Sequence, residues 1–284
     1  MIYFTDKEID ELLAEDVPYF DITTSILKLE NKPAKIQIAT RENTVVCCTE
    51  EVVKIFSKLT IQPTLFTNSG EYIEKDVKFL EGEGLSKNIH ACWRTCENIL
   101  CYASGIATRT RELVELAKES NPDIQILTTR ETIPYTKKIA TKAVMAGGAS
   151  IHRLGLSESI LIFDNHYSFL GDLGNLESRL NEQKSLIANK NITIEVKKPD
   201  DALKVAKSGI DIIVLNRFDV ARIKELKKEI NKINPRIKLA VSGGITDKNV
   251  KEYAASGVDM VISSWPYYAD PSDLSVTITP IFDY

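Results

Sequence analysis

The second half of the chain alternates short apolar segments with longer segments whose apolar residues recur every three or four positions. The short segments have the length of buried strands, and the longer ones have the period of amphipathic helices. Strands that are apolar on both faces and joined by helices form a parallel sheet that helices cover. The predicted strands are 124–129, 149–154, 158–164, 191–196, 210–215, 237–245 and 258–264, and the predicted helices are 134–146, 199–209, 219–233 and 246–257.

The first 120 residues mix both periods and have no repeating strand–helix order. Thr5 and Glu8 have the spacing of a capping box at the start of a helix. Gly105 lies among small residues, which predicts close helix packing and a bend or break in a long helix. The predicted helices are 5–15, 51–59 and 93–120, the predicted strands are 34–48 and a hairpin at 70–81, and a loop is predicted at 16–24.

Composition narrows the classes of function. A chain of 284 residues has the length of about two domains. Its net charge of −4 argues against a nucleic-acid binder, which would carry a basic domain or stripe. The acidic opening segment differs from a signal peptide, and no apolar run reaches the length of a membrane span. We therefore expect a cytoplasmic protein with neither nucleic-acid nor membrane partners.

The five cysteines are interpreted as structural residues in preference to a metal or redox site. Cys47 and Cys48 are adjacent, and Cys92, Cys96 and Cys101 fall in one predicted helix. Cysteine is among the residues most often buried as a small apolar side chain. Buried thiols are therefore the favoured interpretation, and a metal or redox site at Cys92 and Cys96, one helical turn apart, is the alternative.

The order of elements favours an α/β barrel over an open dinucleotide-binding sheet, because no G-x-G-x-x-G follows the first predicted strand of the second half. Active sites of barrels lie at the carboxyl ends of the strands. The polar residues at or near these ends are Arg130, Lys137, His152, Arg153, Glu195, Asn216, Arg217, Ser242, Gly243, Gly244, Ser263 and Ser264.

Cations dominate this set, which favours a small anionic ligand such as a phosphate, a pyrophosphate or a carboxylic acid. Structural salt bridges are the alternative for Arg130 and Arg153. Glu195 lies within an apolar strand, where a charge is costly unless it is paired or liganded. It is interpreted as a contact to a metal or a ribose, or else as the partner of an arginine. Ser242, Gly243 and Gly244 predict a phosphate-binding loop or a simple tight turn.

Five segments recur together in the order and spacing of a known family. They are WRTCENILCYASGIATRTRELV, TTRETIPYTKK, GGASIHRLGLSESILIFDNH, IEVKKPDDA and SGGI. The chain resembles the quinolinate phosphoribosyltransferase (nicotinate-nucleotide pyrophosphorylase) family over nearly its whole length. The segments DVPYFDITT and SSWPYYADPSDLSVTI make it most similar to the ModD branch, which is associated with molybdate transport.

The resemblance implies an α/β protein with two domains. An N-terminal α+β sandwich domain would span residues 1–105, and an incomplete six- or seven-stranded α/β barrel would span 106–265. Residues 266–284 would return to the first domain. The implied activity is transfer of phosphoribosyl from phosphoribosyl pyrophosphate to an aromatic, pyridine-type acid, with Mg²⁺ and with release of pyrophosphate. The implied assembly is a homodimer.

The resemblance also implies roles for individual positions. Arg94 would complete the partner subunit's site. Arg130, His152 and Arg153 would hold the acid substrate, with Arg130 and Arg153 also counted as catalytic, and Lys137 would assist. Glu195 would be the catalytic and metal-binding carboxylate. The remaining substrate-binding positions would be Asn216, Ser242, Gly243, Gly244, Ser263 and Ser264.

Several positions depart from the family pattern. Glu131 and Phe163 replace lysines, and Asn216 replaces an aspartate that helps to hold the metal. Together these exchanges make the site more negative, which disfavours quinolinate, a dicarboxylate. Two competing hypotheses follow: a phosphoribosyltransferase with another acceptor, and a non-catalytic anion-binding or regulatory protein on the same fold. An unrelated aldolase or isomerase barrel is disfavoured, since no well-placed lysine or acid pair is found.

The shape of the site departs from the family as well. Tyr135 replaces a glycine and Lys137 replaces an arginine, which keeps the charge and loses the bidentate fork. Trp265 lies in the second phosphate loop, where the family usually has glycine. The bulky Tyr135 and Phe163 predict a flatter and more aromatic acceptor.

Overall fold

The computed structural model describes residues 2–170, 173–187 and 189–282, so residues 1, 283 and 284 of the predicted first domain and C-terminal return lie outside it. The chain divides into two compact units. The first contains Met1–Arg111, Ile133–Gly148 and Tyr267–Tyr284, and the second contains Glu112–Thr132 and Ala149–Pro266. Residues 106–111 and 133–148, which are predicted as part of the barrel domain, belong to the first unit.

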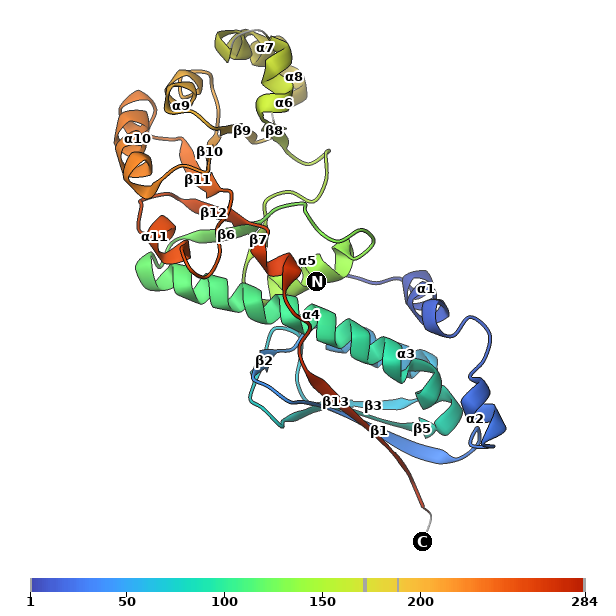
Figure 1. Cartoon of the computed structure of the whole chain (residues 1–284). Coiled ribbons are helices and arrows are strands. Elements are labelled where there is room, and N and C mark those ends of the chain that lie inside the picture. The colour runs from blue at the N-terminus through green and yellow to red at the C-terminus, as the bar shows by residue number, and fades with distance from the viewer. Residues whose placement is uncertain (1, 171–172, 188, 283–284) are drawn as a thin grey trace. The chain divides into compact units, whose positions relative to one another are not determined.

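The first unit is built on antiparallel strands and the long helix α4, which continues into the second unit (Figure 1). Its elements are α1 (Asp6–Asp16), α2 (Ile22–Ile26), β1 (Pro33–Thr40), β2 (Thr44–Val45), α3 (Thr49–Lys58), β3 (Gln62–Leu65), β4 (Tyr72–Ile73), β5 (Lys78–Leu85), α4 (Ser86–Ser120), α5 (Lys137–Ala146) and β13 (Leu274–Pro280), with the short helix η3 (Trp265–Tyr268) at its border.

The second unit alternates strands and helices, as its apolar pattern predicts. Its elements are β6 (Gln125–Thr128), β7 (Ser150–Ile151), β8 (Ile160–Ile162), α6 (Asp164–Tyr167), η1 (Ser168–Leu170), η2 (Leu173–Asn175), α7 (Leu176–Glu182), α8 (Lys184–Ile187), β9 (Ile192–Val196), α9 (Pro199–Val205), β10 (Ile212–Asn216), α10 (Val220–Ile233), β11 (Lys238–Ser242), α11 (Val250–Ala254) and β12 (Met260–Ser263).

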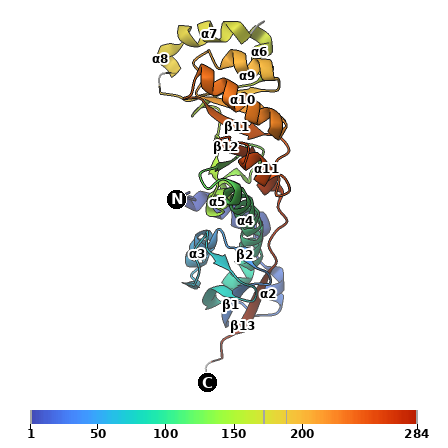
Figure 2. The same ribbon diagram turned by 90° about the vertical axis from the view of Figure 1, so that its left-hand side faces the viewer.

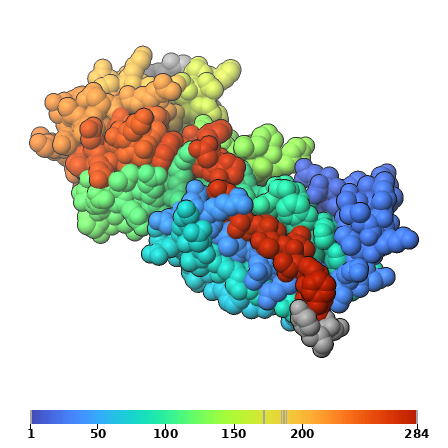
Figure 3. Space-filling view, turned by 60° about the horizontal axis from the view of Figure 1, so that its bottom comes forward, coloured from blue at the N-terminus to red at the C-terminus, as the bar shows by residue number. Residues whose placement is uncertain are grey.

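The main sheet of the first unit has the antiparallel order β13-β1-β5-β3. Along β1, the alternating residues Ala34, Ile36 and Ile38 are buried, as their period predicts. The C-terminal strand β13 pairs with β1 from Ala34–Pro280 to Thr40–Leu274 and lies across the surface of this unit (Figure 3). Chain ends far apart in sequence therefore share one sheet.

Two local predictions in this unit are wrong. Residues 16–24 are not wholly a loop, because the Asp21 carboxylate accepts hydrogen bonds from the N–H groups of Thr23 and Thr24 and starts the short helix α2. The segment 70–81 does not form a hairpin with itself. Strand β4 pairs with β2, whereas β5 pairs with β1 and β3.

Helix α4 runs unbroken from Ser86 to Ser120, so a break near Gly105 does not occur. The predicted close packing is confirmed. A methyl group at Gly105 would collide with the backbone carbonyl of Asp270 in the segment that leads to β13. Glycine is used here because another backbone passes directly over the helix.

The second unit is an incomplete seven-stranded α/β barrel, which confirms the predicted fold class. The strand order is β7-β6-β12-β11-β10-β9-β8, with every pair parallel. Strands β7 and β8 follow each other in sequence and form the two edges, so the sheet stays open between them. Helices α9 and α10 lie side by side on one face (Figures 1 and 2). The apolar interior holds Leu127, Val214, Ala240, Met260 and Ile262.

Three helices of the α/β pattern are shorter than predicted. Helix α9 ends at Val205 and not at residue 209. Helix α5 begins at Lys137 and not at residue 134, after Tyr135 with its positive φ of 66°. Helix α11 covers only Val250–Ala254 of the predicted 246–257. Among the described residues, no helix combines the length and the apolar character needed to cross a membrane.

Candidate active site

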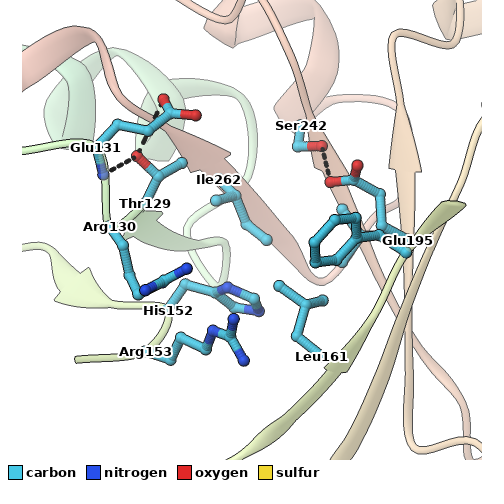
Figure 4. A pocket seen from close by; sticks show the side chains of 11 residues that line it. Thr129, Arg130, Glu131, His152, Arg153, Leu161, Glu195, Ser242 and Ile262 are labelled. Atoms are coloured by element: carbon cyan, nitrogen blue, oxygen red, sulfur yellow. Dashed lines mark hydrogen bonds between the residues drawn. The ribbon is translucent and has the colours of Figure 1, made fainter. Parts of the chain in front are cut away.

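A hollow of about 230 Å³ opens at the carboxyl ends of the barrel strands. Three kinds of side chain form it: cations on one side, a carboxylate on the other and apolar residues between them (Figure 4). The lining residues are Thr129, Arg130, Glu131, His152, Arg153, Leu161, Phe163, Val214, Glu195, Ser242 and Ile262. All belong to the second unit.

The cationic wall comes from the chain that follows β6 and β7. Arg130 is exposed at the end of β6, and His152 and Arg153 follow β7 directly. Arg153 is only 8% exposed, and its Nε has no hydrogen-bond partner among the described residues. Burial and the neighbouring Arg130 both lower the pKa of Arg153. A buried guanidinium with an unused donor is a strong binding group for a carboxylate or phosphate.

His152 precedes this arginine in the chain. The backbone N–H of His152 donates a hydrogen bond to the Thr128 carbonyl at 3.0 Å. Burial, and to a smaller extent the Arg153 charge, lower the pKa of His152 below its ordinary value of 6.5. The imidazole is therefore mainly neutral at pH 7 in the ligand-free protein. It can donate one hydrogen bond to an acid without adding a third full charge.

The lowered pKa of His152 gives a testable pH dependence. As the pH falls through about 6.5, the unfolded chain gains a proton that folded His152 resists, so stability falls with pH. We expect the melting temperature of wild type to drop more steeply between pH 7 and pH 5 than that of His152→Asn. Thermal melts of both proteins across this range measure the difference. Equal slopes would contradict the buried, neutral imidazole.

The opposite wall is formed by Glu195 of β9 and Ser242 of β11 (Figure 4). The Ser242 hydroxyl donates to Glu195 Oε2 at 3.4 Å. Glu195 is half-buried, whereas its neighbours Ile194 and Val196 are fully buried. The alternation of the strand thus turns one carboxylate toward the hollow. The alternative of a direct ion pair between Glu195 and an arginine is not found among the described residues, where the Glu195 side chain accepts the Ser242 hydrogen bond.

The base of the hollow is apolar. Leu161, Val214 and Ile262 contribute to it from β8, β10 and β12. Phe163 lines it too, and its ring meets the His166 ring edge-on, with centroids 4.2 Å apart. The Phe163 N–H donates to His166 Nδ1 at 3.3 Å. This arrangement accommodates a planar ring.

A second hollow adjoins the first and shares Glu195 and Ser242 with it. Gly243 and Gly244 have φ angles of 91° and 77°, and their N–H groups have no hydrogen-bond partner among the described residues. A Cβ at Gly243 would lie 2.7 Å from Arg217 Cγ. Free amides on a left-handed turn form an anion-binding concavity. Helix α11 is too short to add a helix N-terminus to it.

The other predicted residues that line this second hollow differ in their hydrogen bonding and in their exposure. Asn216 ends β10 and lines the hollow together with Ser263 and Ser264. The Ser263 hydroxyl donates to the Ile245 carbonyl at 2.7 Å and accepts from the Trp265 N–H at 3.0 Å. Ser263 thus shapes the loop from a buried position, and Ser264 is the more accessible of the two.

Two predicted substrate-binding residues lie in the first unit, whereas both hollows are lined by the second. The Arg94 guanidinium lies over the Trp93 ring, 4.1 Å from its centroid, and pairs with Glu97. It is half exposed on α4. Lys137 is the first residue of α5. The second unit therefore brings together the predicted residues from Arg130 to Ser264, apart from Lys137, which like Arg94 belongs to the first unit.

The residues at Glu195 fit a Mg²⁺ ion that is held mainly by its substrate. The described residues contain no group of three histidine, cysteine or carboxylate side chains able to form a cage by themselves. Mg²⁺ in phosphate-transfer sites keeps several waters and takes one or two carboxylates together with substrate phosphates. Glu195 would supply a carboxylate and Asn216 an amide oxygen, beside free amides suited to phosphate.

Some lining residues escaped the prediction of the site. Thr129 lines both hollows, and Arg217, noted only as a charge at a strand end, lines the glycine hollow. Leu161, Val214 and Ile262 gave no signal, because an apolar residue in a buried strand looks the same whether it faces the core or a ligand. For Thr129, its place as the last residue of the predicted strand 124–129 was the available signal.

Comparisons with known proteins cover the whole fold. The family model of the quinolinate phosphoribosyl transferase C-terminal domain matches residues 106–277, and that of the N-terminal domain matches residues 21–104. The putative pyrophosphorylase ModD of Pasteurella multocida is 35% identical over 98% of this chain and 99% of its own. A probable carboxylating nicotinate-nucleotide pyrophosphorylase of Methanothermobacter thermautotrophicus is 30% identical over 95% and 97%. The structure of NadC from Streptococcus pyogenes covers 99% of this chain and 100% of its own, with a TM-score of 0.90 at 24% identity.

Proposed function

Since the chain belongs to the quinolinate phosphoribosyltransferase family of pentosyltransferases, we propose that it transfers phosphoribosyl from phosphoribosyl pyrophosphate to an aromatic, pyridine-type acid and releases pyrophosphate. The observation that carries this proposal is the position of Glu195. Its carboxylate lines both the cationic hollow, suited to an acid, and the glycine hollow, suited to phosphate. The reacting ribose would lie where the two hollows meet.

The electrostatics of the two hollows suit this reaction. As pyrophosphate leaves, positive charge develops on the ribose ring, and the nearby Glu195 carboxylate stabilises it. The amides of Gly243 and Gly244 and the Arg217 side chain hold phosphate oxygens. Arg153 and His152 hold the acid group and aim the acceptor ring at the ribose. Mg²⁺, when bound with the substrate, neutralises charge on the departing pyrophosphate.

A non-catalytic, anion-binding protein is the competing proposal. The observation in its favour is Glu131, whose carboxylate lines both hollows where anionic substrates would bind. Glu195 favours the enzyme, because a carboxylate that lines both hollows opposes anion binding and is useful only where positive charge develops on the ribose.

A thermal-shift titration with phosphoribosyl pyrophosphate, with and without Mg²⁺, tests the transferase. A ligand at 100 times its dissociation constant stabilises the folded state by about 2.7 kcal/mol, which gives a clear rise in melting temperature. We expect this rise to require Mg²⁺. Absence of any rise at millimolar concentration would contradict the transferase and favour the anion-binding protein.

The proposal includes a homodimer in which Arg94 completes the partner's site. Its support is the half-exposed Arg94 guanidinium on α4, which lies over the Trp93 ring. We expect Arg94→Ala to abolish transfer while leaving the melting temperature within about a degree of wild type, since exposed substitutions rarely change stability. Arg130→Ala should be inactive too, and mixing the two variants should restore part of the activity. Mixed dimers without activity would refute a shared site.

The cytoplasm is the proposed compartment. All five cysteines are free thiols, and four of them are buried. Free cysteines without disulfides are typical of proteins kept in a reducing environment. The link to molybdate transport that the ModD resemblance implies stays a prediction.

A further inference from the structure

We propose that the acceptor is a planar heteroaromatic ring with a single acid group, and that Phe163 is the residue that selects against a second one. This inference rests on the proposed transferase and deepens it. It concerns only the cationic hollow, so it can fail while the transferase proposal stands.

One anchoring point for an acid is built into the hollow. Arg153 is more than nine-tenths buried, its Nε lacks a partner, and Figure 4 shows its guanidinium on the side where Arg130 and His152 gather. The planar guanidinium matches one carboxylate with two parallel hydrogen bonds. Arg130, by contrast, is exposed and long, so it closes over the same acid group from the solvent side.

Among the described residues, the charged side chains that line this hollow include no cation that could pair with a second carboxylate. Its two cations, Arg130 and Arg153, lie on one side and would hold the first acid group, Glu131 and Glu195 add negative charge, and His152 is mainly neutral. A second carboxylate would lie between a phenyl ring and aliphatic side chains, where an unpaired charge is strongly disfavoured. One acid group, paired with the buried arginine, satisfies the charge of its guanidinium.

Phe163 occupies the place where a second anion would need a cation. It follows β8 and lines the hollow with Leu161. Its edge-on contact with His166 and the hydrogen bond from its own N–H to that ring hold it in place. A fixed aromatic edge beside Leu161 and Ile262 binds the face or edge of a flat ring at little conformational cost.

A single acid group also fixes the products. The ring nitrogen donates its lone pair to C1 of the ribose, and the bond from C1 to the pyrophosphate oxygen breaks with its electron pair leaving on pyrophosphate. The acid held by Arg153 stays on the ring, so no carbon dioxide is released. The products are pyrophosphate and the N-ribosylated ring, which keeps its carboxylate.

Calorimetric titration with three probes tests the inference: pyridine-3-carboxylate, pyridine-2,3-dicarboxylate and neutral pyridine-3-carboxamide, each with and without Mg²⁺ and ribose 5-phosphate. We expect the monocarboxylate to bind at least about tenfold more tightly than either other probe, which corresponds to about 1.4 kcal/mol. Phe163→Lys should reverse the order of the two acids, and the matched control Phe163→Leu should keep it.

Either equal or tighter binding of the dicarboxylate to wild type, or no binding of any acid, would overturn the inference. An unchanged order in a folded Phe163→Lys variant would remove Phe163 as the selecting residue. The Mg²⁺-dependent thermal shift with phosphoribosyl pyrophosphate is measured separately. A failure of the transferase proposal is therefore distinguished from a failure of this inference.

Discussion

Replacing Arg153 by methionine is expected to lower the affinity for pyridine-3-carboxylate by about tenfold to a hundredfold, because a hydrogen bond to a charged group contributes roughly 1.5–3 kcal/mol. The same change should raise the melting temperature of the ligand-free protein. Arg153 is buried with an unused Nε donor and a pKa lowered by burial, so it destabilises the empty fold. A methionine of similar length removes that cost.

The opposite directions of the two effects make this prediction specific. Calorimetric titration measures the affinity, and a thermal melt measures the stability. Arg153→Lys is the control, since it keeps the charge and loses the bidentate fork, so its affinity should lie between those of wild type and the methionine variant. A methionine variant that melts lower and binds the acid normally would make Arg153 a structural residue.

Replacing Glu195 by glutamine is expected to lower kcat by about 100- to 1,000-fold, the usual cost of removing one group that stabilises the transition-state charge. The glutamine keeps the shape and loses the negative charge beside the ribose. The Mg²⁺ requirement of the thermal shift with phosphoribosyl pyrophosphate should weaken as well, because the proposed metal loses its carboxylate. Release of pyrophosphate in the presence of pyridine-3-carboxylate measures the rate.

Glu131→Gln is the matched control, because Glu131 is the other carboxylate that lines both hollows. Removing its charge should tighten phosphoribosyl pyrophosphate binding, since it reduces repulsion of the anionic substrate. If the two variants lose kcat equally, Glu195 has no special position at the reacting centre.

Much of the fold was predictable because its causes are local. Wholly apolar strands alternating with amphipathic helices require a parallel sheet covered by helices, and the seven-stranded incomplete barrel confirms that prediction. Thr5 and Glu8 form their capping box, and Asp219 caps α10, because a cap needs only its own first turn. The polar residues at strand ends meet in one region because parallel strands end at the same edge.

Sequence alone therefore determined the family, the fold class, and the chemical character of most of the site. The tertiary structure decided what depends on residues far apart in the chain. Position 105 of helix α4 requires glycine because the Asp270 carbonyl, 165 positions away in the chain, packs directly against it. The Nε donor of Arg153 has no partner among the described residues, and Leu161, Val214 and Ile262 form the base of a hollow, only because seven separate strands come together in one sheet. Burial and partners belong to a side chain's neighbours in space, which the order of residues along the chain does not specify.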